Sequence, residues 1–194
     1  MNFPLTARFK LLAIAQQISV EDAGGALVLY ARQKAFKLRE AVTVFADEAQ
    51  LRPAFSIQAD RVLDISARYT ISGPGGAELG VLQREGMKSL WRTSYTIDAG
   101  AHGRFTIREE NPWIKLADGL FGAIPIVGML SGYVFHPKYE IARDDGAPVI
   151  HIEKRPALFE GRFEINRVST ADSAALDVLV IGALMMLLLE RQRG

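Results

Sequence analysis

Residues 174–189 read Ala-Ala-Leu-Asp-Val-Leu-Val-Ile-Gly-Ala-Leu-Met-Met-Leu-Leu-Leu. Leucine, methionine and alanine dominate this stretch, and these residues are strong helix formers. Asp172 stands just before it with helix-capping chemistry, and Arg191 follows it near the negative end of the expected helix dipole. The pattern predicts a hydrophobic α-helix over residues 172–192.

The expected helix has no polar face, and such a helix is buried either inside protein or in lipid. Its unbroken apolar run, 178–189, is shorter than the span of about 20 residues that a bilayer requires. Asp177 near its start is costly in hydrocarbon but acceptable near a helix N-terminus. We expect a helix in the core of the protein, and the alternative is a tail anchor with residues 174–189 in a membrane.

The rest of the chain is dominated by a short unit of an aromatic residue, a polar residue and isoleucine. Because residues i and i+2 of a strand share a face, each copy places its aromatic and isoleucine on one face and its polar residue on the other. The copies are spaced irregularly, which argues against a solenoid or a propeller. The pattern predicts half-buried strands of a meandering antiparallel sheet. The copies are Phe55-Ser56-Ile57, Tyr69-Thr70-Ile71, Tyr95-Thr96-Ile97, Phe105-Thr106-Ile107, Tyr139-Glu140-Ile141 and Phe163-Glu164-Ile165.

Turn residues separate the strand patterns. The clearest turn is Asp145-Gly146, since a two-residue hairpin turn requires the positive φ that glycine adopts. Roughly a dozen strands of the usual length follow from such breaks. They are expected near 9–20, 26–33, 42–47, 53–59, 62–71, 78–84, 92–98, 103–109, 131–136, 138–143, 148–153 and 161–167.

So many strands need closure to hide their edges, and a wide barrel needs something to fill its lumen. The apolar helix meets that need. We therefore predict a mainly β fold in which a closed antiparallel β-barrel of about 12 strands surrounds the hydrophobic C-terminal helix. The barrel is expected to form a single domain over residues 1–194.

Two segments of the chain resemble each other. Residues 32–39 read Arg-Gln-Lys-Ala-Phe-Lys-Leu-Arg, and residues 84–92 read Arg-Glu-Gly-Met-Lys-Ser-Leu-Trp-Arg. This loose duplication, together with the strand number and the terminal helix, resembles the tubby C-terminal-like superfamily. The similarity is closest to LURP-one-related and phospholipid scramblase-like proteins, and it covers the chain from about residue 18 onward. It implies a tubby-like barrel that binds phosphoinositides through basic residues.

Basic side chains in the duplicated segments are the first candidate site. If the two copies fold alike, they form a groove for a phosphate or an anionic lipid headgroup. The alternative is a protective role, since charged residues on strand edges block aggregation. The candidate lipid-binding residues are Arg32, Lys34, Lys37, Arg39, Arg84, Lys88 and Arg92.

A second apolar segment, residues 113–130, interrupts the strand pattern. Its glycines, Pro125, Lys115 and Asp118 make it a poor membrane span. We expect a barrel-capping insertion, and the alternative is an exposed apolar tip that enters a bilayer or contacts a protein partner. The residues of that tip are Leu120, Phe121, Ile124 and Ile126.

The composition argues against several functions. With 23 Lys plus Arg and 22 Asp plus Glu, the net charge is only +1, so nothing global favours nucleic acid. The absence of cysteine excludes thiolate chemistry and cysteine-containing zinc sites. His102, His136 and His151 are far apart, and no GxSxG or Walker A motif is present. We expect no catalytic residues, no metal site, no cofactor and no nucleic-acid partner, and we expect His151 at the surface.

The expected function is therefore non-enzymatic. We predict a binding or membrane-associated module that recognises an anionic phospholipid headgroup, a membrane surface or a protein partner. The alternative is a scramblase-like or tail-anchored protein that places its C-terminal helix in lipid. Only 11–15 form an apolar run near the N-terminus, and a signal peptide needs about 7–15 apolar residues, so we expect a cytoplasmic protein without one.

Overall fold

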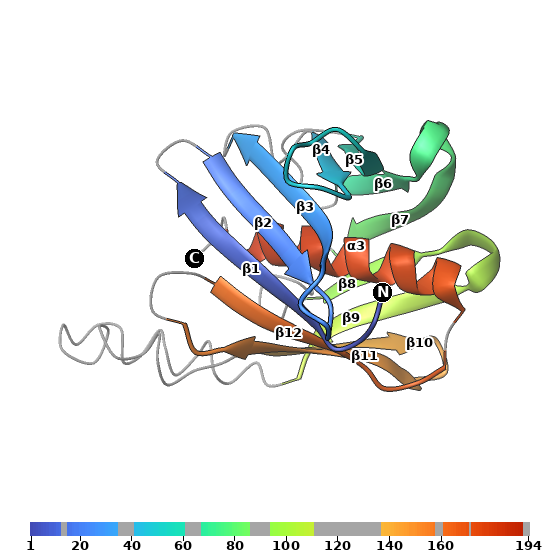
Figure 1. The fold of residues 1–194 in the computed structure, drawn as a ribbon. Helices are drawn as coiled ribbons and strands as arrows, with labels where there is room; N and C mark the ends of the chain where they lie inside the picture. The colour runs from blue at the N-terminus through green and yellow to red at the C-terminus, as the bar shows by residue number, and fades with distance from the viewer. Residues whose placement is uncertain are drawn as a thin grey trace, which may run out of the picture.

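In the computed structural model, every copy of the aromatic-polar-isoleucine unit lies in a β-strand. The structure describes residues 1–12, 15–34, 41–60, 67–85, 94–110, 137–157, 161–170 and 172–191. Twelve antiparallel strands form a closed barrel in this part of the chain, and one helix lies inside it (Figure 1). The predicted mainly β fold with a closed barrel around the C-terminal helix is confirmed.

The strands follow one another around the barrel in chain order, and β12 pairs with β1 to close it. They are β1 (Leu5–Leu12), β2 (Ala15–Glu21), β3 (Leu27–Lys34), β4 (Ala41–Phe45), β5 (Pro53–Ala59), β6 (Arg68–Ser72), β7 (Glu78–Arg84), β8 (Ser94–Asp98), β9 (Arg104–Glu109), β10 (Lys138–Arg143), β11 (Pro148–Arg155) and β12 (Gly161–Arg167). Closure leaves no free sheet edge among them.

The isoleucine of every copy points into the barrel, as the period-two pattern predicts. Ile71, Ile97, Ile107, Ile141 and Ile165 are each completely buried. Their aromatic partners are buried as well, apart from the partly buried Phe55. Burial of these side chains is worth about 25 cal/mol per Å² of apolar surface and drives the sheet to wrap around its own inner face.

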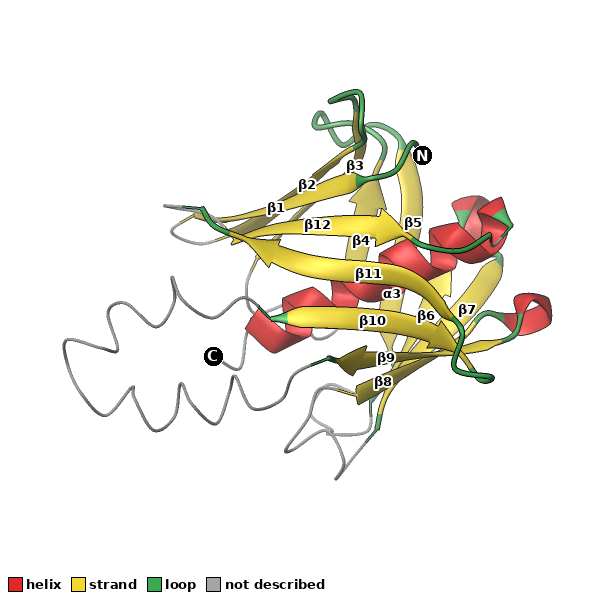
Figure 2. Ribbon diagram, turned by 90° about the horizontal axis from the view of Figure 1, so that it is seen from below, coloured by secondary structure: helices red, strands yellow, loops and turns green. Residues whose placement is uncertain are grey.

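The helix α3 (Ser173–Arg191) runs through the barrel lumen (Figure 2). Its side chains are buried on every side from Val178 to Leu188, which explains why the sequence shows no polar face. The helix is also long and apolar enough to cross a membrane by length and composition alone. In this structure the barrel strands surround the helix, and most of the helix is buried inside the barrel.

The predicted hairpin at Asp145-Gly146 joins β10 to β11. Gly146 has φ +83°, and the turn is closed by a hydrogen bond of 2.9 Å from the Arg143 amide to the Ala147 carbonyl. The glycine-rich segment 73–76 also forms a turn, with the short 3-10 helix η2 (Pro74–Gly76) between β6 and β7. These turns confirm the antiparallel meander.

One expected strand is wrong and one is not described. Residues 9–20 were expected as a single strand, but Leu12 pairs with Ala15, so this segment belongs to two strands, β1 and β2. The segment contains no glycine or proline to mark the reversal. The strand expected at 131–136 lies outside the described residues. The expected capping insertion, residues 113–130, lies outside them as well.

The connections between strands alternate between the two ends of the barrel. At one end, α3 begins beside the loop that joins β8 to β9, where His102 contacts Asp172. At the other end, α3 finishes at Arg191, whose guanidinium donates a hydrogen bond of 3.2 Å to the Phe9 carbonyl of β1. We call this second end the Arg191 end.

Candidate functional site

The segments that the sequence analysis selected connect strands at the Arg191 end. Residues 35–40 join β3 to β4, residues 86–93 join β7 to β8, and residues 111–136 join β9 to β10. In an antiparallel meander these connections fall at one end, because each lies an even number of strands from the next. The strand ends that flank them therefore surround one mouth of the barrel.

The structure places three of the predicted lipid-binding residues on described strands. Arg32 is exposed on the outer face of β3, and Lys34 is the last residue of that strand, where only its backbone is described. Arg84 ends β7 and is only 6% exposed. The remaining predicted site residues lie outside the described residues; they are Lys37, Arg39, Lys88, Arg92, Leu120, Phe121, Ile124 and Ile126.

Arg32 and Arg84 are not brought together. Arg84 shares the inward face of β7 with Leu82, and its guanidinium lies 5.9 Å from the centre of the Tyr95 ring. A cation over an aromatic face is stabilised there by the ring quadrupole. Arg84 therefore belongs to the interior of the barrel, whereas Arg32 belongs to its surface.

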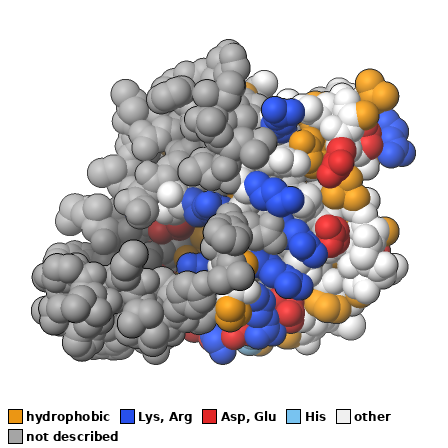
Figure 3. All heavy atoms as spheres, turned by 60° about the vertical axis from the view of Figure 1, so that its left-hand side comes forward, with side chains coloured by type: hydrophobic (Ala, Val, Ile, Leu, Met, Phe, Trp, Pro, Cys, Tyr) orange, Lys and Arg blue, Asp and Glu red, His pale blue; other side chains and the backbone are white. Residues whose placement is uncertain are grey.

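Arg32 instead joins a group of basic residues on the outside of the barrel. Lys10 on β1 lies opposite Gln17 of β2, and Gln17 in turn lies opposite Arg32. Arg162 on β12 pairs directly with Arg8 of β1 and with Arg155 of β11. We call these five residues the basic surface; they are Arg8, Lys10, Arg32, Arg155 and Arg162. Figure 3 shows Lys and Arg side chains gathering on one face of the barrel, with fewer Asp and Glu between them.

Two members of the basic surface are neutralised by carboxylates. Arg8 pairs with Glu21 at 3.1 Å. Arg155 makes two hydrogen bonds of 3.1 Å to Glu164, and the guanidinium of Arg155 holds the pKa of that carboxyl below its usual value.

The other three members, Lys10, Arg32 and Arg162, are exposed, and they make no ion pair within the described part of the chain. They lie on β1, β3 and β12, at the half of each strand nearest the Arg191 end. Arg162 also lowers the pKa of Glu164, so this carboxylate offsets part of its charge. The exposed cations on β12, β1 and β3 still form a positive field that favours anions.

The sequence analysis missed Lys10 and Arg162 because it searched for basic residues close together in the chain. The first and last strands become neighbours only when the barrel closes. A signal was nevertheless present, since Lys10 follows the inward Phe9, and Arg162 precedes the inward Phe163. Period two places both basic side chains on the outer face.

A buried polar cluster lies inside the same end of the barrel. The Tyr95 hydroxyl donates a hydrogen bond of 2.9 Å to Oε1 of Glu190 in the last turn of α3. Burial raises the pKa of the Tyr95 and Tyr139 phenols, and the nearby charge of Glu190 raises both further. Glu109 is also completely buried. This cluster joins the end of the helix to the barrel wall.

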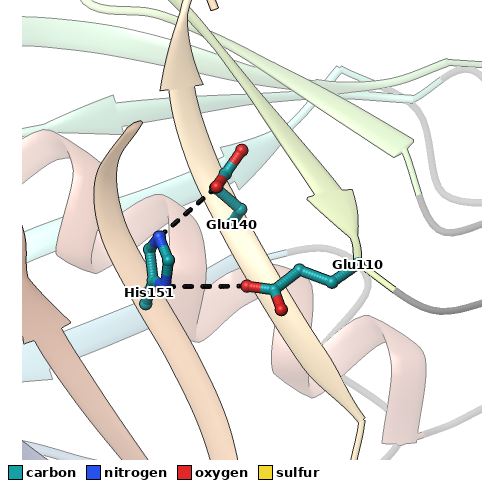
Figure 4. A group of neighbouring side chains, drawn as sticks. All are labelled: Glu110, Glu140 and His151. Carbon is teal, nitrogen blue, oxygen red and sulfur yellow. Dashed lines mark ion pairs between the residues drawn. The ribbon is translucent and has the colours of Figure 1, made fainter. Parts of the chain in front are cut away.

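His151 has two carboxylate neighbours on the outer face of β9, β10 and β11 (Figure 4). Its Nε2 lies 3.3 Å from Oε2 of Glu140, and its Nδ1 lies 3.6 Å from Oε1 of Glu110. The expected surface position of His151 is confirmed, because its neighbours Ile150 and Ile152 are buried while its own side chain is 43% exposed. The sequence analysis did not connect these three residues.

No protein-family model, no curated protein and no solved structure matches this chain. The class of the protein is therefore defined by its own structure. It is a closed antiparallel barrel of twelve strands that encloses an apolar C-terminal helix, with a basic surface on its outside.

Proposed function

We propose that this chain is a tubby-like, LURP-one-related or scramblase-like barrel that acts without catalysis and binds anionic phospholipid headgroups at a cytoplasmic membrane surface. The observation that carries the proposal is the trio Lys10, Arg32 and Arg162, which are exposed and make no ion pair within the described residues. The combination of a twelve-stranded barrel with a central apolar helix supports the family likeness.

The electrostatic attraction of these three cations to an anionic membrane is sufficient for reversible binding. Each Lys or Arg near an anionic leaflet contributes about 1 kcal/mol at physiological ionic strength. Three cations therefore contribute about 3 kcal/mol, which changes partitioning on the order of a hundredfold. Because Debye screening acts over about 10 Å at 0.1 M salt, this contribution falls as salt is added.

The tail-anchored alternative requires α3 to leave the barrel. Its buried residues include Leu179, Val180 and Ile181, none of which is exposed, and their departure would open the inner faces of the strands to water. The headgroup proposal needs no such rearrangement.

The proposal is tested by flotation of the detergent-free protein with vesicles of phosphatidylcholine, with and without phosphatidylserine or a phosphoinositide. We expect flotation only with anionic lipid, and we expect it to weaken from low to moderate salt. The triple variant Lys10→Gln, Arg32→Gln, Arg162→Gln should lose most of the bound fraction.

The matched control removes the same charge at the opposite end of the barrel, with Arg52→Gln, Arg104→Gln and Arg143→Gln. These residues are exposed in the loops and strand ends away from Arg191. The proposal requires the control to float like the unmodified protein. Flotation with neutral lipid that resists salt would indicate insertion of an apolar segment instead, and no flotation would point to a protein partner.

A further inference from the structure

The cluster of Glu110, Glu140 and His151 has the donor atoms of a metal site. Glu140 and His151 are paired directly across β10 and β11, and Glu110 follows the last residue of β9. One ligand atom from each residue can be chosen so that all three lie within 4.8 Å of one another. The three side chains converge on the outer face of three neighbouring strands (Figure 4).

The backbone fixes this convergence. Tyr139 and Ile141 point into the barrel, so Glu140 between them must point outward, and the same alternation directs His151 outward from β11. The Glu110 amide donates a hydrogen bond of 2.9 Å to the Lys138 carbonyl, which continues the pairing of β9 with β10 up to Glu110. Paired strands therefore supply Glu140 and His151, and Glu110 extends from the end of β9.

The ion pairs do not satisfy the ring nitrogen that faces Glu140. His151 Nε2 is buried, and it makes no hydrogen bond with any described residue although Oε2 of Glu140 is 3.3 Å away. In a tetrahedral zinc site, with ligands about 2.1 Å from the ion, neighbouring ligand atoms lie about 3.4 Å apart. The Nε2 to Oε2 distance of 3.3 Å therefore fits two ligands of one ion.

Nearby cations leave the two carboxylates available. Lys138 pairs with Glu153 at 3.3 Å. Arg108 lies opposite Glu140 on β9, yet the two make no ion pair in the structure. Two carboxylates and a neutral imidazole carry two negative charges, which a divalent cation neutralises.

The donor set selects the kind of ion. One imidazole nitrogen and two carboxylate oxygens suit zinc and similar divalent transition metals. Calcium takes six to eight oxygen ligands, and magnesium favours carboxylates and water over imidazole. Three protein ligands also leave a fourth position open, as in zinc sites that bind water or a further ligand.

We propose that Glu110, Glu140 and His151 bind one divalent transition-metal ion of the zinc class on the outer face of β9, β10 and β11. Nε2 of His151 and Oε2 of Glu140 form the fixed half of the site, and the exposed Glu110 side chain rotates to complete it. The site is independent of the basic surface and of lipid binding.

The test is equilibrium dialysis of the full chain against zinc chloride in chelator-treated buffer at neutral pH, with bound zinc counted by atomic emission. We expect one ion per chain with micromolar affinity. His151→Gln should abolish stoichiometric binding, and Glu140→Gln should weaken it by about tenfold or more. All of these side chains lie on the outer face, and circular dichroism checks that each variant remains folded.

The matched control is His102→Gln. Among the described residues, His102 contacts one carboxylate, that of Asp172, so a second acidic donor is not seen there. In ¹⁵N-histidine spectra of the unmodified protein, zinc should shift the His151 ring nitrogens and leave those of His102 unchanged. Absence of stoichiometric zinc binding would overturn the proposal. Equal zinc binding by the protein with and without His151→Gln would overturn it as well.

Discussion

Tyr95 and Glu190 are 95 residues apart in the chain, and a hydrogen bond of 2.9 Å joins the Tyr95 hydroxyl to the Glu190 carboxylate. Tyr95 is completely buried at the start of β8, and Glu190 lies in the last turn of α3. Arg191 follows Glu190 in the chain, and its guanidinium lies 5.6 Å from the centre of the Phe9 ring of β1. The end of the helix is thus attached to strands β8 and β1 of the barrel wall.

Tyr95→Phe should lower the free energy of unfolding by about 2 kcal/mol, since hydrogen bonds to charged groups contribute about 1.5–3 kcal/mol. The substitution retains the ring and removes only the hydroxyl. Urea denaturation at neutral pH measures the change. The control is Tyr30→Phe, because Tyr30 is also buried but its hydroxyl makes no hydrogen bond with any described residue. Equal losses in the two variants would contradict the assigned role of the Tyr95 hydroxyl.

The opposite end of α3 is held by Asp172, which caps the helix. One oxygen of its carboxylate accepts a hydrogen bond of 2.7 Å from the Ala175 amide, and the other lies 2.8 Å from Nδ1 of His102. Asp172→Ala removes both contacts, and we expect a fall in Tm of about 3 °C in a thermal scan. The control is Ser173→Ala at the next position, and it should lower Tm by less than Asp172→Ala does.

The same cap predicts a loss of stability in acid. Hydrogen bonds from the Ala175 amide and then from His102 hold the pKa of the Asp172 carboxyl below 3.8, its usual value. A carboxyl whose pKa is depressed in the folded state stabilises it above the unfolded pKa, and this contribution disappears as pH falls through the folded value. The difference in Tm between the unmodified protein and Asp172→Ala should therefore shrink below about pH 4.

Gly80 marks a close approach between the barrel wall and α3. A Cβ atom there would lie 2.5 Å from the Asp98 carbonyl oxygen and 2.8 Å from a Val178 methyl group. The carbonyl belongs to the backbone of β8 and cannot move without disturbing its pairing with β7. Gly80→Ala should cost about 3 kcal/mol or more in urea denaturation.

Gly182→Ala is the informative comparison, because its Cβ would meet the tip of the Ile97 side chain at 2.6 Å rather than backbone. A side chain can rotate, and alanine in place of a helical glycine gains about 1 kcal/mol of helix propensity. We expect Gly182→Ala to cost less than Gly80→Ala. The reverse order would contradict the close approach of Gly80 to the β8 backbone.

Local periodicity was sufficient to predict most of the fold. Inward Tyr69 and Ile71 show how i and i+2 alternation identifies a strand and its buried face, and Asp145-Gly146 shows how turn chemistry identifies a hairpin. The same alternation also places Arg84 on the inner face with Leu82, a signal that the search for nearby basic residues overlooked. The reversal between Leu12 and Ala15 has no comparable signal, since apolar residues surround it.

The candidate sites were not predicted in the same way, because their residues come together only when strands pair. Lys10 and Arg162 become neighbours when β1 pairs with β12 at the closure of the barrel. Glu140 and His151 are neighbours because of the register in which β10 pairs with β11. A shift of that register by one residue would separate the two side chains. The Asp145-Gly146 turn constrains that register, but no motif marks the two outward side chains as a site.

The buried position of α3 gives the sharpest test of the tail-anchored alternative. Ile181 is completely buried at the middle of the helix, and Ile181→Asp places a carboxylate in an apolar core at a cost of about 4 kcal/mol or more. We expect the variant to lose its cooperative unfolding transition and to appear in the insoluble fraction. Ala174→Asp is the matched control, since Ala174 is exposed in the first turn, where a negative charge is favourable. If the helix instead resided in lipid, the barrel of the Ile181→Asp protein would remain folded and soluble, and that outcome would show that α3 is dispensable to the core.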